Sequence, residues 1–132
     1  MTISMVNPPA WPRPKGYSNG VISSGRLLHV AGQIGWTKDG VFEAKDFVGQ
    51  LDQALANVVE VLHAAGAGPA QIVNMTIFVT DLDAYRSAQR EVGEVWRKRL
   101  GKVYPAMALL GVAGLVEREA LVEIQVVAAL HD

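Results

Sequence analysis

Apolar side chains recur at helical spacing in the first half of the chain. They follow one another at intervals of three and four residues, which places them on one face of a helix. The members of this face are Phe47, Leu51, Leu55, Val58, Val59 and Leu62. Asp46 can cap the start of this helix and Gly66 can end it, because a carboxylate accepts the first free N–H groups and glycine tolerates the left-handed cap.

A second helix is predicted over about residues 82–100. Its inner side carries Tyr85, Ala88, Val92 and Trp96. Its polar side carries Arg86, Arg90, Glu94, Arg97 and Lys98. A basic helix face can bind RNA, but acidic residues interleave with the basic ones here, and this pattern indicates a solvated face.

Short runs rich in β-branched and apolar residues predict the strands. Residues 21–23 and 27–31 are separated by a Ser-Gly pair and predict a hairpin. Further strands are predicted at residues 71–80, at about 106–112 and at about 120–129. The first fifteen residues contain four prolines and are expected to be extended and irregular, because each proline fixes φ and biases its predecessor away from helix.

This order of elements predicts an α+β fold, in which two helices cover a single face of one sheet. Residues 16–132 are expected to form one domain, preceded by the extended, proline-rich segment 1–15. In the last strand Val122, Ile124 and Val126 point to one side, whereas Glu123 and Gln125 point to the other. The uncovered face also carries apolar side chains, and it therefore predicts association with other copies of the chain.

Composition excludes several classes of protein. A chain of 132 residues fits one domain with a real core. Its 12 basic and 13 acidic residues give a net charge of -1, which provides no field to recruit nucleic acid or a membrane. The absence of cysteine excludes disulfides, thiol nucleophiles and thiolate metal sites. No apolar run approaches the ~18 residues that span a bilayer and no signal-peptide pattern is visible, so we expect a cytoplasmic protein.

Three polar or aromatic residues are candidates for a functional site. The three histidines show no metal-ligand spacing. Tyr17 lies beside a glycine turn, Gln33 follows a glycine, and Glu123 interrupts an apolar strand. Burial of an unpaired carboxylate is costly, so Glu123 requires a partner, water or a catalytic role. Each residue also has a structural interpretation: Tyr17 can pack, Gln33 can cap a strand end, and Glu123 can face solvent at the edge of the sheet.

Six segments occur in a characteristic order between about residues 16 and 129. They are YSNGV, VAGQIG, QLDQALANVVEVLHAAGA, IVNMTIFVTDLDAY, YPA and LVEIQVVA. Together they resemble the Rid family of reactive intermediate deaminases, also called YjgF or L-PSP endoribonuclease-like proteins. The resemblance implies a chorismate-mutase-like (YjgF-type) subunit, assembled as a homotrimer with sites in the clefts between subunits. It also implies hydrolysis of reactive enamines and imines without a metal or organic cofactor.

The resemblance further implies roles for individual residues. Tyr17 falls on the tyrosine that lines the family's cleft, and Glu123 on the glutamate that holds or activates water. The family's substrate-gripping arginine is replaced, since the chain reads P-A-M-A with Met107 at that position. A thioether cannot form the bidentate pair that a guanidinium offers a carboxylate. Leu109 keeps a backbone N–H that helps bind substrate, and we expect substrate contacts from Tyr17, Gln33, Met107 and Leu109.

Three functional hypotheses follow. In the first, Glu123 deprotonates water that attacks an imine carbon and returns the proton to the leaving ammonia. Its substrate would then lack a carboxylate, or be held by another arginine such as Arg13, Arg26 or Arg118. In the second, the trimer is non-catalytic and binds a small molecule or a protein. The third, endoribonuclease activity and inhibition of translation, is disfavoured because the chain is nearly neutral and lacks a stripe of basic and aromatic residues.

Overall fold

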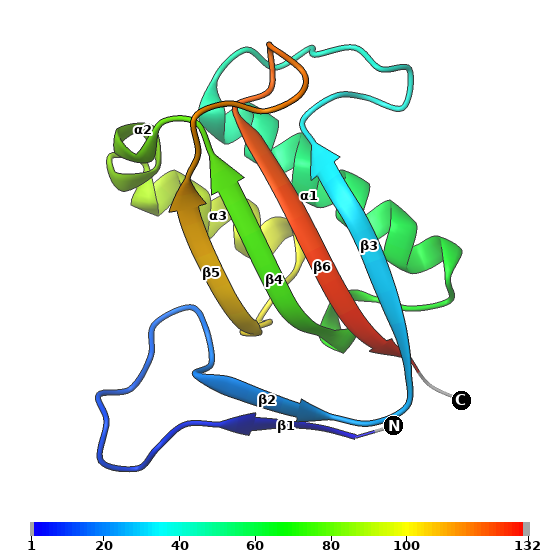
Figure 1. The fold of residues 1–132 in the computed structure, drawn as a ribbon, viewed down its shortest axis with the longest axis vertical. Helices are drawn as coiled ribbons and strands as arrows, with labels where there is room; N and C mark the ends of the chain where they lie inside the picture. Colours follow the sequence, from blue (N-terminus) through cyan, green and yellow to red (C-terminus); the bar gives the residue numbers. More distant parts are fainter. Residues whose placement is uncertain (1, 131–132) are drawn as a thin grey trace.

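The computed structural model describes residues 2–130, which form a two-stranded and a four-stranded sheet together with three α-helices (Figure 1). In chain order the elements are β1 (Ile3–Val6), β2 (Gly20–Ser23), β3 (Arg26–Ile34), α1 (Phe47–Ala64), the 3₁₀ turn η1 (Pro69–Gln71), β4 (Ile72–Val79), α2 (Leu82–Arg86), α3 (Gln89–Arg99), β5 (Ala106–Gly111) and β6 (Val122–Leu130). The predicted α+β class is confirmed.

The main sheet has the strand order β3-β6-β4-β5. Strand β6 pairs antiparallel with both β3 and β4, whereas β4 and β5 are parallel. A parallel pair needs a crossover connection, which α2 and α3 supply between β4 and β5. Helices α1 and α3 lie on the same face of the sheet, behind it in Figure 1. The other face is covered by no element in the part of the chain that the structure describes.

The first two strands differ from the sequence prediction. Strand β2 pairs antiparallel with β1, not with β3, so the predicted hairpin of residues 21–23 with 27–31 is wrong. Residues 3–6, expected to be irregular, supply the partner strand. Gly25, at φ 102, redirects the chain between β2 and β3, and β3 then pairs with β6. The single predicted sheet is therefore a sheet of four strands and a separate pair, which lies across the end where β4 and β5 begin (Figure 1).

The predicted helix over residues 82–100 is two helices. The break lies at Ser87, whose Oγ donates a hydrogen bond to the carbonyl of Ala84 at 3.3 Å. Ala88 then adopts φ -118 and ψ 27, outside the helical region. A serine hydroxyl that bonds local backbone competes with the helical ladder, and the periodicity of apolar residues does not reveal this competition. The inward positions of Val92 and Trp96 are confirmed, since both pack against the core.

The core lies between α1 and the main sheet. The buried face of α1 packs against the side of β6 that carries Val122, Ile124 and Val126. Burial of each such aliphatic side chain contributes about 1.5–3 kcal/mol relative to exposure. The predicted helix start is confirmed: Asp46 accepts a hydrogen bond from the Gly49 N–H at 3.2 Å.

Candidate functional site

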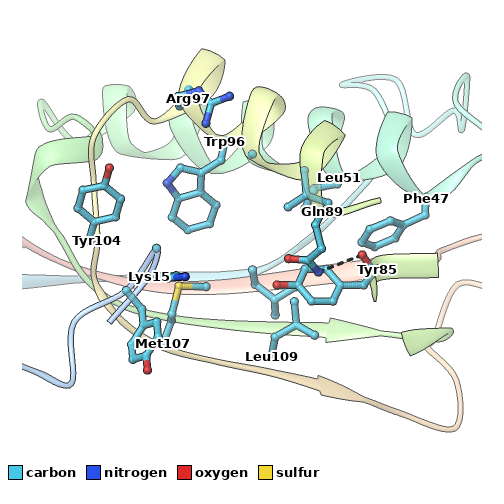
Figure 2. Close-up of a pocket in the computed structure, with 15 residues that line it drawn as sticks. Lys15, Phe47, Leu51, Tyr85, Gln89, Trp96, Arg97, Tyr104, Met107 and Leu109 are labelled. Carbon is cyan, nitrogen blue, oxygen red and sulfur yellow. Dashed lines mark hydrogen bonds between the residues drawn. The ribbon is translucent and has the colours of Figure 1, made fainter. Parts of the chain in front are cut away.

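A cavity of about 490 Å³ lies between the helices and β5 (Figure 2). We call it the β5 pocket. Its floor consists of strand residues and its roof of α2 and α3, while α1 closes the back. The lining residues are Lys15, Gly16, Tyr17, Phe47, Leu51, Ile77, Tyr85, Gln89, Val92, Gly93, Trp96, Arg97, Tyr104, Met107 and Leu109. Pockets of this volume accommodate metabolite-sized ligands.

The register of β5 places Met107 on the floor of the β5 pocket. Met107 lies directly opposite Met75 of β4, and Met75 is fully buried beneath the helices. Residues that face each other in adjacent strands share a side of the sheet, so Met107 also points to the helices. Leu109 pairs with Ile77 in the same way. On the roof, the Trp96 Nε1–H donates to the carbonyl of Val103 at 3.1 Å and fixes the indole.

Tyr17 reaches the same pocket because its neighbour binds the outer edge of β5. The Ser18 N–H donates to the carbonyl of Pro105 at 3.0 Å, and the Ser18 Oγ donates to the carbonyl of Tyr104 at 2.6 Å. Ser18 is buried by these contacts. The structure thus brings together three of the predicted substrate-binding residues, Tyr17, Met107 and Leu109.

Glu123 lies on the opposite face of the sheet. Its neighbours Val122 and Ile124 point into the core, so alternation along β6 directs Glu123 outward beside Phe78 of β4. Its side chain lies against Gly32 of β3, where an added Cβ would be 2.7 Å from the Glu123 Cδ. The carboxylate is half-buried and accepts no hydrogen bond from any residue between 2 and 130.

Gln33 follows Gly32 in β3, at the bulge where the register with β6 shifts. Its Nε2 donates to the carbonyl of Ala31 at 3.1 Å, so the amide bonds its own strand. Among the predicted site residues, Gln33 is the one adjacent to the glycine that contacts Glu123.

Within one chain Glu123 lies on the opposite face of the sheet from Met107, Leu109 and Tyr17, and the resemblance implies that they meet in a cleft between subunits. The strand register explains the separation, because residues paired across strands face the same side of the sheet. Ile77 pairs with both Leu109 and Ile124, so Leu109 faces the same side as Ile124. Glu123 is offset by one residue and faces the other side. The candidate site therefore consists of two half-sites on opposite faces of the sheet.

The charge of the β5 pocket comes from residues that the sequence analysis did not single out. Lys15 and Arg97 line the pocket, and no acidic residue does. Of the arginines proposed as replacements, Arg13 lines an adjacent hollow, while Arg26 and Arg118 line neither cavity. Arg97 immediately follows the inward-facing Trp96 on α3. Its place next to Trp96, at the edge of the apolar face of α3, could have indicated a pocket residue. The alternation of basic and acidic residues instead predicted that Arg97 lies on a solvated face.

An ion-pair cluster holds α3 against α1. Asp52 of α1 accepts from Arg99 Nε at 2.6 Å and from Lys98 Nζ at 3.0 Å. Burial raises the pKa of Asp52, but the hydrogen bonds and charges of Arg99 and Lys98 outweigh it, and the pKa lies below its ordinary value. This cluster therefore supports the roof of the β5 pocket.

Neither a metal centre nor a membrane span is found in the described residues. Between residues 2 and 130 no three His, Asp or Glu side chains are grouped closely enough to hold a metal ion. No helix in this range is long and apolar enough to cross a bilayer.

The fold and its two half-sites correspond to a known class of small α+β proteins. The sequence profile described as Endoribonuclease L-PSP matches residues 10–130. The chain therefore belongs to this family, which is the Rid family, and the resemblance seen in the sequence is confirmed.

Individual relatives support the same assignment. A crystal structure from Yersinia pestis, YyfB, described as a protein of unknown function of the Rid family, superposes with a TM-score of 0.87 at 32% identity and covers 98% of this chain and 100% of its own. A RutC family protein from Aquifex aeolicus is 34% identical, over 93% of this chain and 96% of its own length. The human 2-iminobutanoate/2-iminopropanoate deaminase is 29% identical, over 85% and 78% respectively. The family thus includes deaminases.

Proposed function

We propose that this protein is a cofactor-free hydrolytic deaminase of a reactive enamine or imine, with Glu123 as its acid-base residue. The observation that carries the proposal is the state of Glu123. Its carboxylate stands in an apolar strand on the open face, forms no hydrogen bond with residues 2–130 and keeps its oxygens accessible to solvent, so it is free to bind water or a substrate. The kinship with an imine deaminase supports the reaction class.

Glu123 would act on water and then on the leaving group. Its carboxylate removes a proton from water while the water oxygen forms a bond to the imine carbon, and it returns that proton to the imine nitrogen, which gives a carbinolamine. Glu123 then removes the hydroxyl proton and delivers it to the nitrogen as the C–N bond breaks, so that a carbonyl compound and ammonia result. Positioned proton transfer of this kind typically contributes about 10²–10⁴-fold in rate.

The proposal includes assembly as a homotrimer, because the two half-sites face away from each other in one chain. The open face around Glu123 carries exposed Leu27 and Leu110 together with half-buried Phe78 and Val127. Apolar side chains on an uncovered face favour contact with another copy. In such a trimer the open face of one subunit would meet the β5 pocket of the next, and each cleft would combine Glu123 with Tyr17, Met107 and Leu109.

A second candidate is a non-catalytic trimer that binds a small molecule or a protein in the same cleft. Met107 favours this alternative, because the residue type that grips a substrate carboxylate in relatives is missing from β5. RNA cleavage is not proposed, because the net charge of -1 supplies no attraction for a phosphate backbone.

The proposal is tested by ammonia release from imines that amino-acid oxidases generate in situ, with Glu123→Gln beside the wild type. We expect a loss of about 100-fold or more, equivalent to about 2.7 kcal/mol in the activation barrier. Gln125→Ala is the matched control, since Gln125 is two residues along the same face of β6. Light scattering measures the oligomeric state of all three proteins. No release from any imine would favour the binding protein, whereas equal rates for wild type and Glu123→Gln would remove Glu123 as the acid-base residue.

A further inference from the structure

We infer that the β5 pocket takes a monocarboxylic acid with an aromatic or branched apolar group. The apolar group would lie against the floor of the pocket, and Lys15 and Arg97 would supply the positive charge that attracts the carboxylate. As the substrate class of the deaminase, this inference rests on the proposed function. As the ligand class of the pocket, it can be measured without turnover.

The apolar end of the ligand follows from the floor and back of the pocket. Leu51, Ile77, Met107 and Leu109 present only apolar atoms, and Trp96 covers them from α3 (Figure 2). A thioether makes favourable contacts with aromatic rings, and its flexible side chain adapts to groups of different shape. The apolar lining extends from the strands to Trp96, so a three-carbon acid would leave part of this surface in contact with water.

The charged end follows from the two basic side chains. Lys15 comes from the N-terminal segment and Arg97 from α3, and Figure 2 shows them on different walls of the pocket. Between residues 2 and 130 neither forms an ion pair, whereas the neighbouring Lys98 and Arg99 both bind Asp52. The pocket lining contains no carboxylate that could neutralise them. An anionic ligand group would supply the missing partner.

Gly93 lies beneath the side chain of Arg97 on α3. A Cβ at Gly93 would lie 3.4 Å from Arg97 Nη1, so the guanidinium lies along the helix over the glycine, and Gly93 itself lines the pocket. Met107 offers no cation on β5, so the positive charge of the pocket comes from α3 and the N-terminal segment, and the ligand is expected to bind with its polar end at the rim.

Three stable probes that undergo no deamination test this arrangement in the full chain by isothermal titration calorimetry. Phenylacetate carries both the ring and the charge, phenylacetamide the ring alone, and acetate the charge alone. We expect phenylacetate to bind at least about 10-fold more tightly than either of the others. Equal affinities for phenylacetate and phenylacetamide would contradict recognition of the carboxylate. Equal affinities for phenylacetate and acetate would contradict recognition of the apolar group.

Variants locate the two ends. Arg97→Gln should weaken phenylacetate binding about 5-fold and leave phenylacetamide unchanged, because an exposed cation contributes modestly. Lys15→Gln in addition should bring the loss to about 20-fold. Arg90→Gln is the control, since Arg90 is on the same helix but pairs with Glu94 and does not line the pocket. If Arg97→Gln and Arg90→Gln lose the same affinity for phenylacetate, Arg97 has no specific role in binding the carboxylate.

The outcomes separate this inference from the proposed function. Phenylacetate binding that depends on Arg97, together with no ammonia release from any imine, would uphold the ligand class and remove the deaminase. Ammonia release from small imines together with no phenylacetate binding would uphold the deaminase and overturn the ligand class.

Discussion

The two faces of the main sheet, built from the same strands, differ in what they present to a ligand. The helix-covered face builds the β5 pocket from the N-terminal segment, three helices and two strands, and its lining is apolar with a basic rim. The open face presents Glu123 on a single strand, held by contact with Gly32. One half-site therefore offers volume and charge for a ligand, whereas the other offers one accessible carboxylate. Under the proposed function, binding and chemistry would depend on separate faces of the sheet and could be perturbed separately.

Met107→Arg should have the largest effect on substrate preference, because it introduces a cation on the floor of the β5 pocket. The open face should stay unchanged. A guanidinium on β5 would provide a bidentate partner for a small carboxylate and reduce the room for an aromatic group. We expect the preference between the imine from alanine and the imine from phenylalanine to shift about 100-fold toward alanine, equivalent to about 2.7 kcal/mol. Ammonia release from both imines measures this ratio.

Met107→Leu is the control for this substitution, since it keeps an apolar side chain of similar volume. Its preference should stay close to that of the wild type. The wild type could instead show high activity on the alanine imine, and Met107→Arg could abolish it. This result would contradict the proposal that Met107 contacts the apolar group of the substrate.

Gly32→Ala tests the open face with an intermediate effect. The added Cβ would lie 2.7 Å from Glu123 Cδ, and since this side chain is flexible, its carboxylate should move instead of the backbone. We expect turnover to fall about 10-fold, because small displacements of a catalytic group are costly, with little change in the unfolding midpoint. Phenylacetate affinity should remain unchanged, since the pocket lies on the other face.

Gly35→Ala is the matched comparison in the same strand region. Its Cβ would lie 2.7 Å from the carbonyl oxygen of Gln50 and 2.8 Å from its Cα, which are backbone atoms of α1 and cannot move freely. We expect the free energy of unfolding to fall by about 1–3 kcal/mol, as for other overpacked sites. If Gly32→Ala is destabilised to the same degree, Gly32 has a general packing role and does not specifically position Glu123.

The face that each residue of the central strands occupies could be predicted from the sequence. Alternation along β6 separates Glu123 from Val122 and Ile124, and the structure confirms it. The relation between strands was not predictable in the same way, because alternation within one strand does not give its register with the next. The register places Met107 and Glu123 on opposite faces within one chain, whereas the resemblance implies that they meet between two subunits.

Two further features depend on interactions that a linear pattern does not contain. The pairing of β2 with β1 requires a strand in the proline-rich start, where proline content argued for irregular chain. The basic rim includes Arg97, which follows the inward-facing Trp96 on α3. The interleaved charges of this helix predict a solvated face and do not indicate that Arg97 also lines the pocket. In both cases tertiary contacts override the local signal.

Asp52→Asn tests the support of the covered face and should have the smallest effect. It removes the ion pairs with Lys98 and Arg99, and we expect the free energy of unfolding near pH 7 to fall by about 0.5–1 kcal/mol. Because the pKa of Asp52 is lowered in the folded state, the contribution is present above its unfolded pKa and disappears as the pH falls through the folded pKa. Urea unfolding of both proteins should therefore differ at pH 7, and the difference should shrink from about pH 4 downward and disappear below the folded pKa of Asp52. A difference that persists in acid would show that Asp52 acts through packing, and phenylacetate affinity would report whether the roof of the β5 pocket depends on this cluster.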